Sequence, residues 1–330
     1  MPPFSLHGLQ SAARIATLVG TLAASASSLA AQGAVDPRVA PRAAALIRQG
    51  ERGVATDMLG RYLATANEDG RAWLQLGRLY LLEAHDWHAR HEGQPDASLY
   101  LEFAAAALQQ ADELVVDSGT VYRAMVEVER AILVYEDSGW VATHRTVTMK
   151  ALPALPPALR ELGENLLASC PSGGVLLTGG DAETVAAWYA ALRPSTRAAV
   201  VPIRPDLYVT DERYRVVTAK LLEVDPRLPI RTAVSAVATR RPVCISPGTD
   251  TAAVPAIQWK VSRLVRVSRG EIPRDVALSF AAFAEEERAR PGEWLEATRE
   301  VYVRAARLNP RLCPALATVF AGTPPAACRP

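Results

Sequence analysis

The stretch WLQLGRLY at residues 73–80 has the clearest helical pattern in the first part of the chain. Its large apolar side chains, Trp73, Leu76 and Tyr80, recur every three or four residues, which places them on one face of an α-helix. Gly77 follows Leu76, and a glycine at this position allows close approach of a second backbone. The stretch therefore predicts a helix that packs tightly against a neighbouring helix.

The same spacing, W-x2-L-G-x2-Y, resembles the first helix of a tetratricopeptide repeat, a helix pair of 34 residues. One period earlier, Ala55, Leu59 and Tyr62 occupy second-helix positions of a preceding repeat. In the next repeat the matching second-helix triplet, within residues 104–111, comes about 15 residues later than the period predicts. The resemblance covers residues 36–135 and implies stacked helix pairs with a concave face that binds peptides or partner proteins.

The extra length in the second repeat is a polar insertion at residues 85–96, which contains His85, His88 and His91. A spacing of three keeps at least two imidazoles on one helical face. Neutral imidazoles in such an arrangement bind zinc or copper. The alternative is a solvated extension whose histidines share no role. The sequence leaves both interpretations open and indicates no other cofactor.

The spacing of apolar residues changes in the second part of the chain. We interpret residues 36–140 as the helical part and residues 141–157 as a linker. Short apolar runs that alternate with helical patterns over residues 158–270 predict a small, mostly parallel three-layer α/β domain. Helices follow at residues 271–310, and a tail with Pro and Cys at residues 311–330. The predicted fold class is therefore α + α/β, with tetratricopeptide-like repeats, an α/β domain and C-terminal helices.

The run LLTGGDAET at residues 176–184 is the sharpest local feature of the second part, because a predicted strand ends there in a turn and a helix begins. With Trp188 and Tyr189 in the following helix, this run resembles a segment in the soluble region of a bacterial membrane-protein family related to O-mannosyltransferases. The resemblance covers residues 155–270. It implies a fold and no transfer activity, because no membrane-spanning part accompanies it.

A glycine-rich turn between a strand and a helix can bind a ligand at the edge of a sheet. The candidate ligand-binding residues are Gly179, Gly180, Asp181 and Thr184. We expect Asp181 to cap the following helix or, alternatively, to contact hydroxyl groups or a divalent ion. The run lacks the glycine motifs of phosphate-binding loops. We interpret the turn as structural, with a ligand-binding edge as the alternative.

Charge and the N-terminal stretch bear on location. Lys and Arg total 36 against 35 Asp and Glu, which gives a net charge of +1. The chain lacks the excess of positive charge that is typical of nucleic-acid-binding proteins. Residues 1–31 contain Arg14, an apolar run and small residues near Ala30, which is typical of a cleaved secretory signal peptide; a retained anchor is the alternative. We expect an exported protein, periplasmic or secreted, with no stable membrane span after cleavage.

The four cysteines lie in the second part of the chain, and export would place them where disulfides persist. A bridge between Cys313 and Cys328 would close a loop of about 15 residues and fix a Pro-rich tail. Cys170 and Cys244 are either a second bridge or buried thiols beside strands.

No catalytic centre is evident: the chain lacks Gly-x-Ser-x-Gly, and no histidine follows His144. The leading hypothesis is a scaffold that binds another envelope or periplasmic protein through the concave face. Its candidate contacts are Arg71, Gln75, Arg78 and Tyr80. The alternatives are a ligand-binding protein or enzyme that uses the glycine-rich turn, and a metal-handling protein. The sequence leaves the oligomeric state open.

Overall fold

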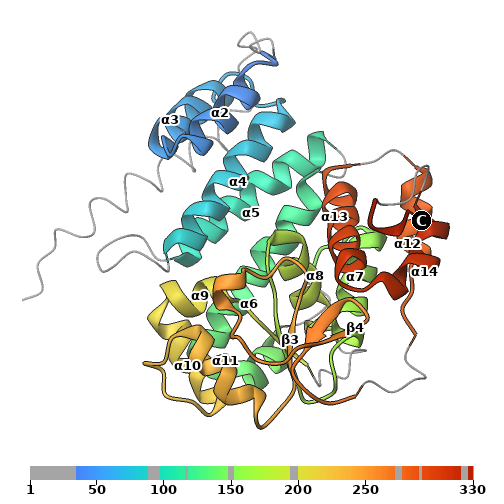
Figure 1. Cartoon of the computed structure of the whole chain (residues 1–330). Helices are drawn as coiled ribbons and strands as arrows, with labels where there is room; N and C mark the ends of the chain where they lie inside the picture. The colour runs from blue at the N-terminus through green and yellow to red at the C-terminus, as the bar shows by residue number, and fades with distance from the viewer. Residues whose placement is uncertain are drawn as a thin grey trace, which may run out of the picture.

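The computed structural model describes residues 35–87, 97–115, 118–147, 152–193, 200–271, 277–289, 292–320 and 326–329. The predicted signal peptide and residues 88–96 of the insertion, with His88 and His91, lie outside the described residues. Figure 1 shows a helical part above an α/β part, with the C-terminal helices beside it. No helix in the described ranges has the length and apolarity needed to cross a membrane.

The helical part contains α2 (Val39–Arg48), α3 (Arg52–Leu63), α4 (Gly70–Trp87), α5 (Ala97–Leu114) and α6 (Ser118–Thr146). Asp69 starts α4, because its carboxylate accepts hydrogen bonds from the backbone N–H groups of Arg71 and Ala72. α5 packs along α4, and α6 packs along α5. A Cβ on Gly77 would lie 2.5 Å from Cγ of Leu108 in α5. The tight helix pair predicted from residues 73–80 is therefore formed by α4 and α5.

α6 extends into the predicted linker at residues 141–157. The helix continues to Thr146 with one break at Gly139, whose φ is 76°. Beyond the break, Trp140 is buried with edge-to-face contacts to Tyr135 and Trp188. Aromatic packing against the α/β part therefore keeps the segment up to Thr146 helical, and Val147 and residues 152–156 are irregular in the described part.

The sheet contains β1 (Val175–Leu177), β2 (Val201–Ile203), β3 (Val243–Ile245), β4 (Lys260–Ser262) and β5 (Val265–Val267). The strand order is β2-β1-β3-β5-β4. β1 pairs in parallel with β2 and β3, whereas β5 pairs antiparallel with β3 and β4. The sheet is therefore mixed, and the predicted parallel arrangement holds for the first three strands alone.

The helices that connect the parallel strands are α8 (Asp181–Leu192), which follows β1, and α9 (Pro205–Thr210), α10 (Glu212–Leu222) and α11 (Ile230–Ala238), which separate β2 from β3. From β1 the chain moves to β2 on one side and then crosses to β3 on the other. Right-handed crossovers then place α8 and the group α9–α11 on opposite faces of the sheet. Such a reversal leaves a crevice at the carboxyl ends of the strands.

The C-terminal helices are α12 (Ala281–Arg288), α13 (Glu293–Leu308) and α14 (Cys313–Val319). α12 and α13 pack on α7 (Pro157–Ala168), and α14 packs on both. Phe320 after α14 packs edge-to-face on Phe283, so the predicted tail is partly helical and joins the core. Disulfides join Cys313 to Cys328 and Cys170 to Cys244.

α6 connects the cores of the helical and α/β parts. Its side chains Val128 and Ile132 belong to the large buried cluster that contains the sheet and the C-terminal helices. Tyr122 and Val126 belong to the cluster formed with α4 and α5. Because one helix is buried on both sides, apolar packing holds the two parts against each other.

Candidate functional site

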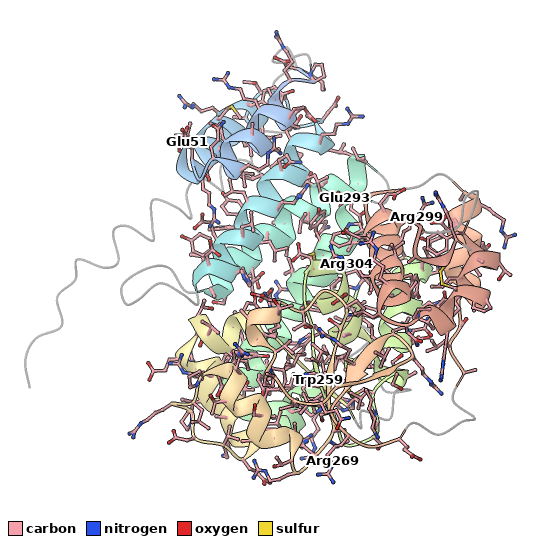
Figure 2. All side chains as sticks on the ribbon, in the orientation of Figure 1. Glu51, Trp259, Arg269, Glu293, Arg299 and Arg304 are labelled. Atoms are coloured by element: carbon pink, nitrogen blue, oxygen red, sulfur yellow. A yellow bond between two sulfur atoms is a disulfide. The ribbon has the colours of Figure 1, made fainter. Side chains whose placement is uncertain are left out.

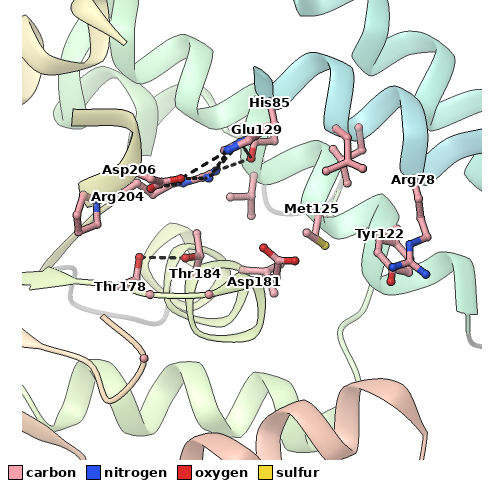
Figure 3. A pocket seen from close by; sticks show the side chains of 18 of the residues that line it. Arg78, His85, Tyr122, Met125, Glu129, Thr178, Asp181, Thr184, Arg204 and Asp206 are labelled. Atoms are coloured by element: carbon pink, nitrogen blue, oxygen red, sulfur yellow. Dashed lines mark hydrogen bonds and ion pairs between the residues drawn. The ribbon is translucent and has the colours of Figure 1, made fainter. Parts of the chain in front are cut away.

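A pocket of about 350 Å³ lies between the helical part and the sheet. Its floor consists of the turns that follow β1, β2 and β3, and its roof consists of side chains from α4 and α6 (Figure 3). The pocket therefore occupies the crevice that the reversed strand order creates at the carboxyl ends of the parallel strands.

The floor depends on two glycines from different turns. A Cβ on Gly179 would lie 2.2 Å from the carbonyl oxygen of Gly248, and a Cβ on Gly248 would lie 2.8 Å from that of Gly179. Gly180 adopts a φ of 74°, which a residue with a Cβ rarely adopts. Gly179 and Gly180, both predicted as ligand-binding residues, thus shape the turn that carries the neighbouring polar side chains.

The buried carboxylate of Glu183 connects the turn after β1 with the turn after β3. Glu183 is 1% exposed and accepts hydrogen bonds from the N–H of Gly179 at 3.2 Å, the N–H of Gly248 at 2.8 Å and the hydroxyl of Ser246. Burial raises the pKa of the Glu183 carboxyl to about 7, against the opposing effect of these hydrogen bonds. The sequence analysis missed this residue, although a glutamate within the almost continuously apolar residues 182–192 is the signal of a buried carboxylate.

Asp181 and Thr184, the other two predicted ligand-binding residues, lie in the first turn of α8 and line the pocket (Figure 3). The Thr184 hydroxyl donates to Oγ1 of Thr178 at 3.1 Å. The N-cap of α8 is Gly180, with no side-chain cap hydrogen bond, so the prediction that Asp181 caps this helix is wrong. Asp181 is exposed and forms no hydrogen bond or ion pair with the other described residues.

At one end of the pocket lies Arg204, which follows β2 and is 8% exposed. Its Nη1 donates to Oε1 of Glu129 at 2.5 Å and its Nη2 to Oδ2 of Asp206 at 2.7 Å, while the same Nη2 lies 3.1 Å from Nδ1 of His85. Burial alone would lower the pKa of Arg204, but the two carboxylates outweigh burial and hold the pKa above its usual range. Arg204 thereby ties β2 to α4 and α6.

Of the three histidines predicted to bind a metal, His85 lies within the described residues. Its ring nitrogens lie 3.6 Å from Oε1 of Glu129 and from Oδ2 of Asp206, with the Arg204 guanidinium beside them. A guanidinium at this position would repel a metal cation. Within the part of the chain that the structure describes, no group of three or more His, Cys, Asp or Glu side chains has the arrangement of a metal site.

Arg78 lies at the opposite end of the pocket (Figure 3). Its guanidinium stacks over the ring of Tyr122, 4.9 Å from the ring centroid, and its Nη2 lies 3.8 Å from Oε1 of Glu293. The Tyr122 hydroxyl donates to the same Glu293 oxygen at 3.0 Å, at the end of α13 that lies beside the helical part (Figure 2). Arg78, predicted as a partner contact on an open concave face, is instead at the junction of α4, α6 and α13.

The other predicted protein-binding residues do not gather around Arg78. Arg71 is exposed at the start of α4, and Gln75 is partly buried. Tyr80 lies about 200° around the helix from Arg78. Its ring packs on Phe103 of α5, with ring centroids 5.4 Å apart, and it lines an open groove of about 720 Å³ between α3, α4 and α5. The four residues therefore do not form one contact surface.

A scan against protein-family models found no match, and searches of curated proteins and of solved structures found none either. The resemblance of residues 36–135 to tetratricopeptide repeats and the resemblance of residues 155–270 to the membrane-protein family stay predictions.

Proposed function

We propose that this protein binds a small polar molecule in the pocket between its helical part and its sheet. The observation that carries the proposal is the position of the pocket at the carboxyl ends of three parallel strands, where the strand order reverses. Ligands of open α/β sheets bind at such positions.

The lining of the pocket supports this function. Apolar side chains such as Leu81, Met125 and Val185 alternate with the polar groups of Arg78 and Asp181. Pockets for small molecules combine a mostly apolar wall with a few placed polar groups, and their volumes begin at about 300 Å³. The lining and the volume of about 350 Å³ both meet these criteria.

The proposal is tested by the melting temperature of the purified protein in the presence of a panel of amino acids, dipeptides, sugars, organic acids and nucleotides. At least one compound should raise the melting temperature, and Asp181→Asn should abolish that rise. Asp250→Asn is the matched control, because Asp250 lines the same pocket but its Oδ1 already accepts the N–H of Ala252 at 2.9 Å. A panel without any effect, or equal rises in both variants, contradicts the proposal.

Protein binding by an exported, tetratricopeptide-like scaffold is a second proposal. The groove between α3, α4 and α5 favours it, because this open surface combines the rings of Tyr80 and Tyr100 with the exposed carboxylate of Asp57. A tagged protein should retain one specific partner from an envelope extract and lose it on Asp57→Arg, but not on Glu113→Arg in α5. The N-terminal mass of the same sample measures signal cleavage. An unchanged set of retained proteins in the Asp57 variant counts against this proposal.

A further inference from the structure

The end of the pocket near α13 carries two opposite charges that do not neutralise each other. Arg78 and Asp181 both line this end, both are within the described residues, and no ion pair joins them. Two opposite charges that face one cavity without pairing with each other indicate a ligand that carries both complementary charges.

Arg78 has donors available for an anionic group. An arginine side chain has five N–H donors, and the ion pair of Arg78 with Glu293, at 3.8 Å, is longer than a hydrogen bond. The contact of its guanidinium with the Tyr122 ring, 4.9 Å from the ring centroid, is a cation–π contact and not a hydrogen bond to an acceptor atom. Arg204 differs, because Glu129, Asp206 and His85 already surround its guanidinium. A carboxylate, which accepts two parallel hydrogen bonds, matches the free edge of Arg78.

Asp181 is complementary to a cationic donor. An ionised carboxylate only accepts hydrogen bonds, and the first turn of a helix stabilises its negative charge. An ammonium group supplies both the charge and the N–H donors that Asp181 lacks. A phosphate or a second carboxylate at this position would be repelled.

The rest of the wall is complementary to an apolar side chain. The pocket is also lined by Leu81, Met125, Val128 and Val185. Figure 3 shows Met125 between Arg204 at one end and Arg78 at the other. A cavity of about 350 Å³ suits a molecule the size of an amino acid or a dipeptide.

From these observations we infer that the ligand is a zwitterion, an apolar α-amino acid or a short peptide of such residues. Its ammonium group binds Asp181, its carboxylate binds Arg78, and its side chains contact the apolar wall. This inference rests on the proposed function of the pocket and specifies its class of ligand.

Isothermal titration calorimetry with analogues that differ by one charge tests the inference. The probes are L-leucine, L-leucyl-L-leucine, N-acetyl-L-leucyl-L-leucine, which lacks the ammonium group, and L-leucyl-L-leucinamide, which lacks the carboxylate. L-leucine or the dipeptide should bind, and each modified dipeptide should bind at least tenfold more weakly than the parent. This factor corresponds to the loss of one charge-assisted hydrogen bond.

Matched variants assign each charge to its residue. In Asp181→Asn, the dipeptide and its N-acetyl analogue should bind with equal affinity, because the partner of the ammonium group is gone. In Arg78→Gln, the dipeptide and its amide should become equal for the corresponding reason. Asp57→Asn, at an exposed position of α3 outside this pocket, should retain the preferences of the unmodified protein. Circular dichroism establishes that each variant is folded.

The outcomes separate this inference from the proposed function. If a sugar or an organic acid raises the melting temperature in an Asp181-dependent way while neither leucine compound binds, the zwitterion is wrong and the pocket remains a ligand site. Equal binding of the dipeptide and both modified forms also contradicts the inference that the ligand is a zwitterion. If no compound of the panel binds, both proposals fail.

Discussion

The two ends of the pocket use arginine in different ways. Arg204 is buried, and two carboxylates and an imidazole surround its guanidinium. Arg78 is partly exposed, stacks on Tyr122 and has one distant carboxylate, that of Glu293. Burial with its donors occupied makes Arg204 part of the structure, whereas spare donors make Arg78 available to a ligand. The number of occupied donors therefore distinguishes a structural charge from a binding charge better than the residue type does.

Arg204→Met should have the largest effect on stability. Removing the guanidinium breaks the buried ion pair between Arg204 and the carboxylate of Glu129, and breaking a buried pair in this way costs roughly 3–5 kcal/mol. The free energy of unfolding in urea measures the loss. A loss below about 1 kcal/mol would show that the Arg204 contacts are not structural.

Glu183→Gln should change the pH dependence of stability. Because burial raises the folded-state pKa from the ordinary 4.5 to about 7, folding favours the protonated form. The stabilising contribution is therefore complete below pH 4.5 and is lost as the pH rises through 7. The unmodified protein should lose up to about 3 kcal/mol over this range relative to the variant. Unfolding experiments across this pH range measure the difference, with Glu113→Gln as an exposed control. Parallel pH profiles for Glu183→Gln and the unmodified protein would contradict the assignment.

Gly179→Ala should destabilise the floor of the pocket, where the turns after β1 and β3 meet. The added Cβ meets the backbone of Gly248, and overpacking of this kind costs about 1–3 kcal/mol. Gly60→Ala in α3 is the control, because no atom lies within 4 Å of its added Cβ. The control should gain about 0.5–1 kcal/mol from the helix preference of alanine. Equal changes in melting temperature for the two variants would argue against the contact between the turns.

Arg78→Gln should have the smallest effect on stability, below about 1 kcal/mol, because its ion pair is long and partly exposed. The same urea titration measures it beside Arg204→Met. A loss as large as that of Arg204→Met would make Arg78 structural and would remove the contrast between the two ends.

Local patterns in the sequence predicted much of the fold. Residues 73–80 predicted a tightly packed helix, and Gly77 does contact Leu108 of α5. The turn at Gly179 was a candidate ligand-binding edge, and it does line a pocket. These features depend on neighbouring residues, whose spacing the sequence displays directly.

The remaining features depend on contacts that no local pattern displays. Arg204 and Glu129 are 75 positions apart in the chain. The residues next to Arg204 give no sign of this partner, so the sequence alone does not distinguish Arg204 from a surface arginine. The antiparallel end of the sheet was missed for a local reason. The turn between β4 and β5 has Arg263 at a φ of 53°, where a hairpin signal would normally show Gly or Asn.

The most direct test of the account is a crystal structure of the protein with L-leucyl-L-leucine bound at saturation. We expect a dipeptide in the pocket, with its ammonium nitrogen hydrogen-bonded to Asp181 and its carboxylate against Arg78, and with the Arg204 contacts to Glu129 and Asp206 unchanged. A dipeptide bound at Arg204 in place of Glu129, or bound outside the pocket, would contradict it.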